Sequence, residues 1–428
     1  MPTRVPPLAE HARASRSDAS VAAIRRRTFR RRRLFVFGSL GLAMLTLLYV
    51  FVASVAPLPS AAAAAVQHTI EQPKVQPAWP SWGSGAVSAI GTSGLIAQHG
   101  SAASVPMASM TKTITALVVL QKKPVPAGRN GPTITFTQAD VKILQQVWAE
   151  DGSWAPVAAG DRLTERQALT AMLLPSANNY ARSLAIWAFG STSAFLSATK
   201  TWLTAHGFSH TRVTDASGLD PGSVASPADL VGIGKLVLAD PVLSAIVATK
   251  VAALPGAGTV HNGNKVLGVA GIDGVKTGWT DQAGHCLLFS ARTTLGGRTF
   301  TVVGVVLGAP QYGDLWTAVP KLVTSITSAY RSVTLAGPST TLGSYTTAWG
   351  KRATLTTTAP ATMPVFSDAP ISVTVRSRSL QVARPGDDLG TVTFSSGGSS
   401  VTRTLTVTEP IDDPGLGWRL SHPLDLFL

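Results

Sequence analysis

Ser109 and Lys112 form the first pair of residues in this sequence whose types and spacing could support nucleophilic chemistry. They lie three positions apart in a stretch, 106–120, that we expect to be helical, and residues three apart on a helix share one face. The serine hydroxyl would therefore lie beside the lysine amine. A serine is a weak nucleophile that needs a neighbouring base, and a lysine can be that base when burial or a nearby positive charge lowers its pKa.

The same spacing occurs again at Ser197 and Lys200, in a stretch with the pattern of an ordinary helix. A sequence this rich in serine is expected to contain such a match by chance. Neither pair alone therefore indicates a catalytic site, and other motifs have to distinguish between them.

Two further motifs could place polar side chains in a cleft. Ser176 and Asn178 follow a proline between two helical stretches, where a loop could direct both side chains inward. Lys276-Thr277-Gly278 follows a short glycine-rich segment, and a glycine within a strand indicates close approach of a ligand or another backbone. Each motif alone also fits a purely structural interpretation, as helix punctuation in the first case and as a glycine-rich turn in the second.

The three motifs together are far more specific than any one of them. Ser-x-x-Lys, Ser-x-Asn and Lys-Thr-Gly form one signature of penicillin-binding proteins and class A β-lactamases, and here they occur in that order. Their surroundings resemble the D-alanyl-D-alanine carboxypeptidases, the low-molecular-mass penicillin-binding proteins. The resemblance covers about 80–333 and extends weakly to the C-terminal region. It rests on segments 106–112, 176–179, 215–220, 226–230, 264–265 and 273–280.

The resemblance implies a fold and an activity. The fold would be α/β (α+β) of the β-lactamase/transpeptidase type, an antiparallel sheet flanked by helices with a helical subdomain and the active site between them. The activity would be that of a serine-type D-Ala-D-Ala carboxypeptidase, which removes the terminal D-alanine from peptidoglycan pentapeptides. Such an enzyme needs no cofactor and no metal, and penicillins and other β-lactam antibiotics would acylate its nucleophile as substrate mimics.

The resemblance also implies a role for each motif residue. The catalytic residues would be a nucleophile, its base and a proton relay, which are Ser109, Lys112 and Ser176. Substrate would be bound by Asn178, Lys276, Thr277, Gly278 and Trp279. The backbone N–H groups of Ser109 and Trp279 would form the oxyanion hole.

Other functions remain as alternatives on the same residues. A D,D-endopeptidase or a β-lactamase would share the fold, and a cell-wall-binding protein could carry an inactive hydrolase domain. Residues 191–274 contain no glutamate, which favours a peptidase over a class A β-lactamase with its deacylating glutamate. A phosphate loop would need glycine directly before Lys276, and His206 and His210 lack the acidic residue of a zinc peptidase motif.

Local signals indicate the elements that must position these residues. Thr164 with Gln167 predicts a capping box at a helix start, and Ser226 before a proline predicts another helix start. A strand pair is expected within 86–98, and strands 286–291 and 299–307 are expected to form a hairpin through Gly296-Gly297. A helix over about 315–330 would end the peptidase region, 81–333.

The region 334–428 differs in composition. Serine, threonine, valine and glycine dominate it, and apolar residues alternate with polar ones, as in Val373 and Val375. That period is typical of half-buried strands. We therefore expect a small all-β C-terminal domain.

The N-terminal segment predicts a membrane anchor. Residues 1–33 contain ten arginines and two acidic residues, so this basic tail holds eight of the 14 net positive charges of the 428-residue chain. The apolar run 34–56 is long enough to cross a bilayer, and the arginines before it predict a cytoplasmic N-terminus and an extracytoplasmic catalytic domain. A cleaved signal peptide is the alternative. Because the positive charge adjoins an apolar run, we do not expect a nucleic-acid partner.

Two smaller features complete the expected organisation. Residues 57–80 are rich in alanine, proline and serine, which is typical of a flexible linker. Cys286 is the single cysteine of the chain, which excludes internal disulfides and cysteine-based metal sites.

Overall fold

A five-stranded antiparallel sheet forms the centre of the region that carries the motifs. In this computed structural model its strand order is β11-β12-β13-β2-β3. The strands are β2 (Ser84–Ala89), β3 (Ala97–His99), β11 (Ile272–Thr280), β12 (Gly284–Leu295) and β13 (Arg298–Ala309). The expected strand pair within 86–98 is confirmed as β2 and β3, and the two later strands pair as β12 and β13.

The structure describes residues 11–66, 70, 74–92, 94–295, 298–367, 369–396 and 399–428. The expected turn at Gly296-Gly297 lies outside these residues. The described strands on either side of it are antiparallel, with Leu295 opposite Arg298.

Helices cover both faces of this sheet. One face packs against α9 (Tyr312–Ser328), which buries Val319, Leu322 and Val323 in a cluster with residues of β12 and β13. The other face packs against α7 (Pro227–Ala239) and α8 (Pro241–Val247). The predicted start of α7 is confirmed, because the Ser226 hydroxyl accepts the Asp229 N–H at 3.1 Å. The predicted sheet flanked by helices is therefore correct.

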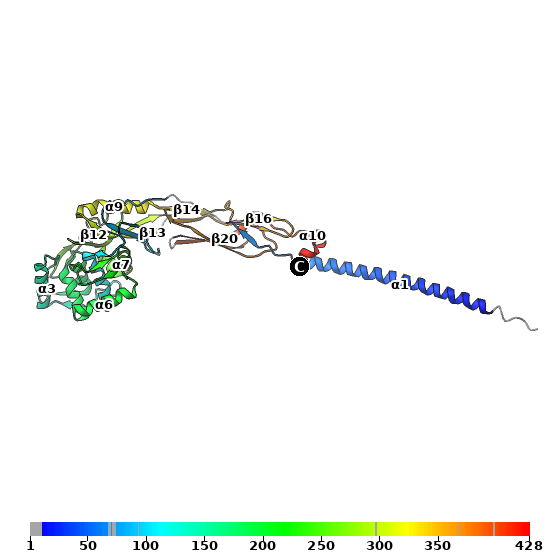
Figure 1. Cartoon of the computed structure of the whole chain (residues 1–428), viewed down its shortest axis with the longest axis horizontal. Coiled ribbons are helices and arrows are strands. Elements are labelled where there is room, and N and C mark those ends of the chain that lie inside the picture. Colours follow the sequence, from blue (N-terminus) through cyan, green and yellow to red (C-terminus); the bar gives the residue numbers. More distant parts are fainter. Residues whose placement is uncertain are drawn as a thin grey trace, which may run out of the picture.

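A second group of helices packs around α5 and forms the helical subdomain (Figure 1). Its members are α2 (Thr111–Lys122), α3 (Gln138–Ala149), α4 (Glu165–Leu173), α5 (Asn178–Phe189) and α6 (Thr192–Ala205). The predicted capping box of Thr164 and Gln167 is confirmed at the start of α4. Short strand pairs connect these helices: β5 (Thr133–Thr135) with β6 (Arg162–Thr164), β4 (Val105–Pro106) and β7 (Thr211–Arg212) with β8 (Val224–Ala225), and β9 (Val251–Leu254) with β10 (Gly258–His261).

Two helix boundaries differ from the expectation. The helix expected from residue 106 begins with a 3-10 turn, η1 (Ala108–Met110), followed by α2, while Pro106 belongs to β4. Ala108 has φ of +46°, a conformation that cannot continue an α-helix, so the regular helix starts after it. The helix expected over 315–330 is α9, which starts earlier because Gln311 and Asp314 form a capping box.

The C-terminal region forms the expected β-domain, but it is not all-β, because two short helices lie within residues 415–427. Its main sheet has the order β1-β15-β16-β20-β19-β18, and β14 pairs with β17 beside it. The strands are β14 (Tyr330–Ala336), β15 (Gly343–Thr346), β16 (Arg352–Thr357), β17 (Ala361–Phe366), β18 (Ser372–Ser377), β19 (Gly390–Ser396) and β20 (Ser399–Val407). Alternating residues of these strands, such as Leu355, Phe394 and Leu405, are fully buried in one core.

Part of the expected linker belongs to this domain. The strand β1 (Ala63–Ala65) pairs with β15, and Ala61 forms a β-bridge with Leu380. The expectation of a flexible linker over 57–80 is therefore wrong for these residues. Backbone hydrogen bonds and packing of the Ala61 and Ala63 side chains against the domain core both supply the contact.

The molecule is elongated, with the α/β region at one end and a long N-terminal helix at the other (Figure 1). That helix, α1 (His11–Val55), contains a segment, Arg27–Val55, which is long and apolar enough to cross a membrane. Its C-terminal end contacts the short helix α10 (Gly415–Ser421), which is followed by α11 (Pro423–Phe427) at the chain end. The β-domain lies between these two ends.

Candidate active site

The first motif brings a hydroxyl and an amine into direct contact. Lys112 Nζ donates to Ser109 Oγ at 2.8 Å and to the backbone oxygen of Ser217 at 2.9 Å. Ser109 lies in η1 and Lys112 in the first turn of α2, so the helical spacing predicted from the sequence places them on one face. Ser109 is partly exposed, whereas the Lys112 side chain is fully buried.

Electrostatics favour the neutral amine at Lys112. Burial lowers the pKa of Lys112 well below its usual value, and the nearby charge of Lys276 lowers it further, while Asp215 opposes both effects. A neutral amine at hydrogen-bond distance from a serine hydroxyl can accept its proton. The pair therefore has the geometry of a nucleophile and its base.

The segment 215–219 holds the carbonyl that contacts Lys112. The Asp215 carboxylate accepts the backbone N–H groups of Ser217, Gly218 and Leu219 at 2.9–3.2 Å, and also the Ser223 hydroxyl. Gly218 has φ of +80°, and a Cβ there would lie 1.8 Å from the Ala108 oxygen. Only glycine permits this close approach to the turn that carries Ser109.

The roles of Asp215 and Ser217 were not identified from the sequence. The segment 215–220 was recognised only as part of the resemblance. An aspartate two residues before a serine and three before a glycine is typical of a side chain that caps its own turn. That local signal could have identified the turn, but not its contact with Lys112.

The third motif lies on β11, at an edge of the sheet. Lys276 is 2% exposed and donates to the Thr277 oxygen at 3.0 Å, and burial lowers the pKa of Lys276 to about 7. A Cβ at Gly278 would lie 3.3 Å from the Ser109 backbone nitrogen and 3.2 Å from the Met107 oxygen. The predicted close approach of another backbone at Gly278 is confirmed.

The second motif lies between α4 and α5. Ser176 has φ of +65°, and Asn178 is the first residue of α5. Within the described part of the chain, the buried Ser176 Oγ and Asn178 Oδ1 have no hydrogen-bond partner. Both atoms are thus available to bind a ligand or to relay a proton.

A contact through Gly263 joins the second and third motifs. The Gly263 N–H donates to the Leu174 oxygen at 3.0 Å, two residues before Ser176, and a Cβ at Gly263 would lie 3.0 Å from Thr277 Oγ1. The three motifs therefore meet in one place. Trp279, the residue after the third motif, is 50% exposed there and stacks on His285 with ring centroids 5.7 Å apart.

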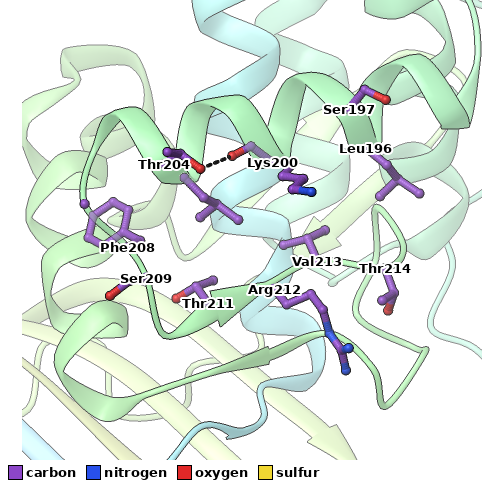
Figure 2. A pocket seen from close by; sticks show the side chains of 12 residues that line it. Leu196, Ser197, Lys200, Thr204, Phe208, Ser209, Thr211, Arg212, Val213 and Thr214 are labelled. Carbon is purple, nitrogen blue, oxygen red and sulfur yellow. Dashed lines mark hydrogen bonds between the residues drawn. The ribbon is translucent and has the colours of Figure 1, made fainter.

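The second serine–lysine pair lies elsewhere. Ser197 and Lys200 are exposed on α6 and line a separate pocket of about 560 Å³ opposite Arg212 (Figure 2). No hydrogen bond joins their side chains in the described part of the structure, and neither other motif contributes to this pocket. The tertiary structure thus separates two sequence patterns that have the same spacing.

Similar proteins share the region that contains these motifs. The family peptidase S11, described as D-alanyl-D-alanine carboxypeptidase, matches residues 86–311. A D-alanyl-D-alanine endopeptidase of Pseudomonas aeruginosa is 29% identical over 202 residues, which cover 45% of this chain and 60% of that protein. A D-alanyl-D-alanine carboxypeptidase of a Streptomyces species is 30% identical over 224 residues, 47% of this chain and 72% of that protein. The chain thus spans about 60% of the length of the Pseudomonas relative.

Solved structures share the fold. The DD-transpeptidase of Streptomyces K15 is 27% identical with a TM-score of 0.51, over 57% of this chain and 97% of that one. Penicillin-binding protein 5 of Haemophilus influenzae is 18% identical with a TM-score of 0.55, over 80% of this chain and all of that one. The similarity to the Haemophilus structure concerns the fold alone, and it extends well beyond the region matched by the Streptomyces structure.

Proposed function

Because the chain belongs to the peptidase S11 family of D-alanyl-D-alanine carboxypeptidases, we propose that it removes the terminal D-alanine from peptidoglycan stem peptides. The observation that carries the proposal is the 2.8 Å contact between Lys112 Nζ and Ser109 Oγ, formed by a fully buried lysine. The enzyme would act as a serine peptidase through an acyl-enzyme.

The acylation step uses the first motif. Lys112, whose lowered pKa favours the neutral amine, accepts the Ser109 proton while Ser109 Oγ attacks the carbonyl carbon of the penultimate D-alanine. Negative charge then develops on the carbonyl oxygen. The backbone N–H groups of Ser109 and Trp279 stabilise this oxyanion, and the close approach of Gly278 to the Ser109 nitrogen supports that role.

The leaving group needs a proton. Ser176 relays the proton from Lys112 to the nitrogen of the departing D-alanine, the C–N bond breaks, and an ester to Ser109 remains. Water then attacks the ester, with Lys112 again accepting a proton, and releases the shortened peptide. The buried Ser176 Oγ, which has no partner among the described residues, is available for this relay.

The remaining motif residues bind substrate. Lys276 and Thr277 bind the terminal carboxylate of the substrate through charge-assisted hydrogen bonds. Asn178 Oδ1, which has no hydrogen-bond partner among the described residues, binds the substrate amide. A β-lactam presents a similar carboxylate and carbonyl, so such antibiotics acylate Ser109 as well.

Hydrolysis of the D-alanyl cross-link between two stem peptides, a D,D-endopeptidase activity, is the second candidate. It is favoured by the similarity to the Pseudomonas relative, which is named an endopeptidase. Relative kcat/KM values on a pentapeptide and on a cross-linked dimer of stem peptides distinguish the two activities.

The membrane assignment is part of the same proposal. The apolar segment of α1 anchors the protein, and its arginine-rich flank keeps the N-terminus in the cytoplasm. The catalytic domain then lies outside, where peptidoglycan is found. Protease accessibility of the two ends in intact cells tests this orientation.

Labelling with a fluorescent penicillin tests the nucleophile. Ser109→Ala is expected to abolish labelling, because no other serine hydroxyl accepts a hydrogen bond from Lys112 Nζ in the described structure. Ser197→Ala is the matched control and is expected to label like the wild type. Labelling that survives Ser109→Ala would rule out Ser109 as the nucleophile.

A further inference from the structure

Two tryptophans form a half-exposed pair close to the second motif. Trp148 lies near the end of α3 and Trp154 in the loop that follows, with ring centroids 5.3 Å apart and planes at 81°. Each is 47% exposed. Large aromatic side chains are normally well buried, so a half-exposed pair close to the second motif indicates a binding surface.

The loop that carries Trp154 is fixed to the residues after Ser176. The Asn178 N–H donates to the Ser153 oxygen at 2.7 Å. The Asn179 amide contacts both the nitrogen and the oxygen of Ala155, at 3.2 and 2.9 Å, and the Tyr180 hydroxyl donates to the Pro156 oxygen at 2.8 Å. These contacts hold Trp154 in place relative to the active site.

The loop also touches a proposed substrate-binding side chain. A Cβ at Gly152 would lie 2.6 Å from Asn178 Nδ2. Trp154 is two residues further along the chain, and an extended residue spans about 3.3 Å. The Trp154 backbone therefore lies within roughly 7 Å of this contact, about the length of two residues of a bound peptide.

The charge beside the indoles selects the kind of ligand. The turn between the tryptophans contains Glu150 and Asp151, and the Asp151 N–H donates to the Trp148 oxygen at 3.1 Å. Glu150 is paired with Arg182. Asp151 is exposed and forms no ion pair within the described residues. Indole faces attract cations, so an aliphatic chain that ends in an ammonium group suits this surface.

We propose that Trp148, Trp154 and Asp151 bind the side chain of the residue that precedes D-Ala-D-Ala when that residue is a diamino acid with a free amine. The inference rests on the proposed function, in which Asn178 binds the amide of the substrate. Acylation of the amine, as in a cross-link, removes its positive charge. The subsite therefore favours stem peptides that are not cross-linked through this residue.

Three short substrates test the subsite in the full-length protein. They are N-acetylated tripeptides that end in D-Ala-D-Ala and begin with lysine, Nε-acetyl-lysine or alanine. The wild type is expected to prefer the lysine peptide by about tenfold in kcat/KM over the other two. Trp154→Ala and Asp151→Asn are expected to reduce this preference to within about twofold, with the alanine peptide and the penicillin acylation rate nearly unchanged. Ile186→Ala, an exposed apolar residue on α5, is the control and keeps the preference.

Each other outcome overturns the proposal. A preference retained in both variants would show that the indoles and Asp151 do not contact the side chain. An equal loss on all three peptides would assign Trp154 to positioning of the Asn178 segment.

Failure of the proposed function can be told apart from failure of the subsite. If the wild type hydrolyses none of the peptides, the proposal of a carboxypeptidase activity is wrong. In that case, binding of the same peptides to the Ser109→Ala variant still tests the subsite, and tryptophan fluorescence measures this binding. Tighter binding of the lysine peptide supports it, and equal binding or none overturns it.

Discussion

Lys112 experiences opposing electrostatic influences that set its protonation state. Burial and the charge of Lys276 lower the pKa of Lys112, whereas Asp215 raises it. Asp215 also orders the turn whose carbonyl accepts a hydrogen bond from Lys112. Burial and the neighbouring cation thus act together to favour the neutral amine of Lys112.

Replacement of Lys276 by alanine tests this coupling. Without the like charge, the pKa of Lys112 rises, so the acidic limb of the kcat/KM profile shifts to higher pH. Peptides amidated at the C-terminus isolate this shift, since they lack the carboxylate that Lys276 would bind. On free peptides an additional loss of roughly 30-fold or more is expected, from about 2–5 kcal/mol for a lost buried charge partner.

The control for this prediction is Lys200→Ala, which removes an exposed positive charge outside the motifs. Its profile is expected to match the wild type on both substrates. An acidic limb that does not move in Lys276→Ala would show that Lys276 does not influence Lys112. Equal losses of kcat/KM on free and amidated peptides would contradict the proposed contact between Lys276 and the substrate carboxylate.

The turn 215–219 packs closely against the turn that carries Ser109, so the position of each turn depends on the other. Gly218→Ala is expected to destabilise the protein by more than about 1 kcal/mol and to lower penicillin labelling, because the new Cβ would meet the Ala108 oxygen at 1.8 Å. Thermal unfolding and labelling rates measure the two effects.

Gly190→Ala is the matched control for that prediction. Gly190 has φ of +83°, close to the +80° of Gly218, but nothing lies within 4 Å of the position that a Cβ would take there. Backbone strain of about 1 kcal/mol is therefore expected without any loss of labelling. Similar labelling in the two variants would show that the close approach at Gly218 does not position Ser109.

The start of α4 contains a buried carboxyl group that the proposed mechanism does not use. Glu165 is fully buried, and neither of its carboxylate oxygens has a hydrogen-bond partner among the described residues. Burial raises the pKa of Glu165 from 4.5 to about 7, although Lys123 lowers it. The folded state therefore binds the proton more tightly than the unfolded state.

A pH series with Glu165→Gln tests this linkage. The contribution of the raised pKa to stability is fully present below about pH 4.5 and is lost as pH rises to about 7. The variant lacks this loss, so it is expected to exceed the wild type by about 1–3 kcal/mol at pH 8 and to differ little at pH 4.5. Denaturant unfolding at both pH values measures the free energy of unfolding of each protein. The same pH dependence in the variant and the wild type would contradict this prediction.

Contacts between the two ends of the chain determine the arrangement of the whole molecule. The Arg419 guanidinium donates to the Ala53 and Ala56 oxygens at the end of α1 and pairs with Asp413 at 2.7 Å. The Tyr49 hydroxyl donates to the Leu420 oxygen at 2.7 Å. These contacts satisfy carbonyls that the helix end would otherwise leave unpaired, and they join the β-domain to the proposed anchor.

Removal of residues 1–56 is expected to give a soluble protein with undiminished peptidase activity. The motifs lie at the opposite end of the molecule from α1 (Figure 1), and the solved Streptomyces structure, of which this chain covers 97%, corresponds to only 57% of this chain. The measurement is kcat/KM on a diacetylated Lys-D-Ala-D-Ala peptide. A folded, soluble product without activity would show that the N-terminal segment contributes to the site.

The family, the sheet flanked by helices and the C-terminal β-domain could be predicted from the sequence alone. Three motifs in a fixed order carry the family, and local signals such as the capping box of Thr164 depend on residues a few positions apart. Strand alternation likewise reflects burial of one face of a sheet. These features are local in the chain, so they can be predicted without knowledge of the tertiary contacts.

The order of the motifs already favoured Ser109 and Lys112 over Ser197 and Lys200, whereas the contacts of this pair with segments distant in the sequence depend on the tertiary structure. Only the tertiary structure decided that Asp215 orders the Ser217 carbonyl, that Gly218 approaches Ala108, and that residues 61–65 belong to the β-domain. Each of these contacts joins segments far apart in the sequence. Burial and charge at Lys112 arise from such contacts, because a pKa depends on the groups that surround the side chain in space rather than along the chain.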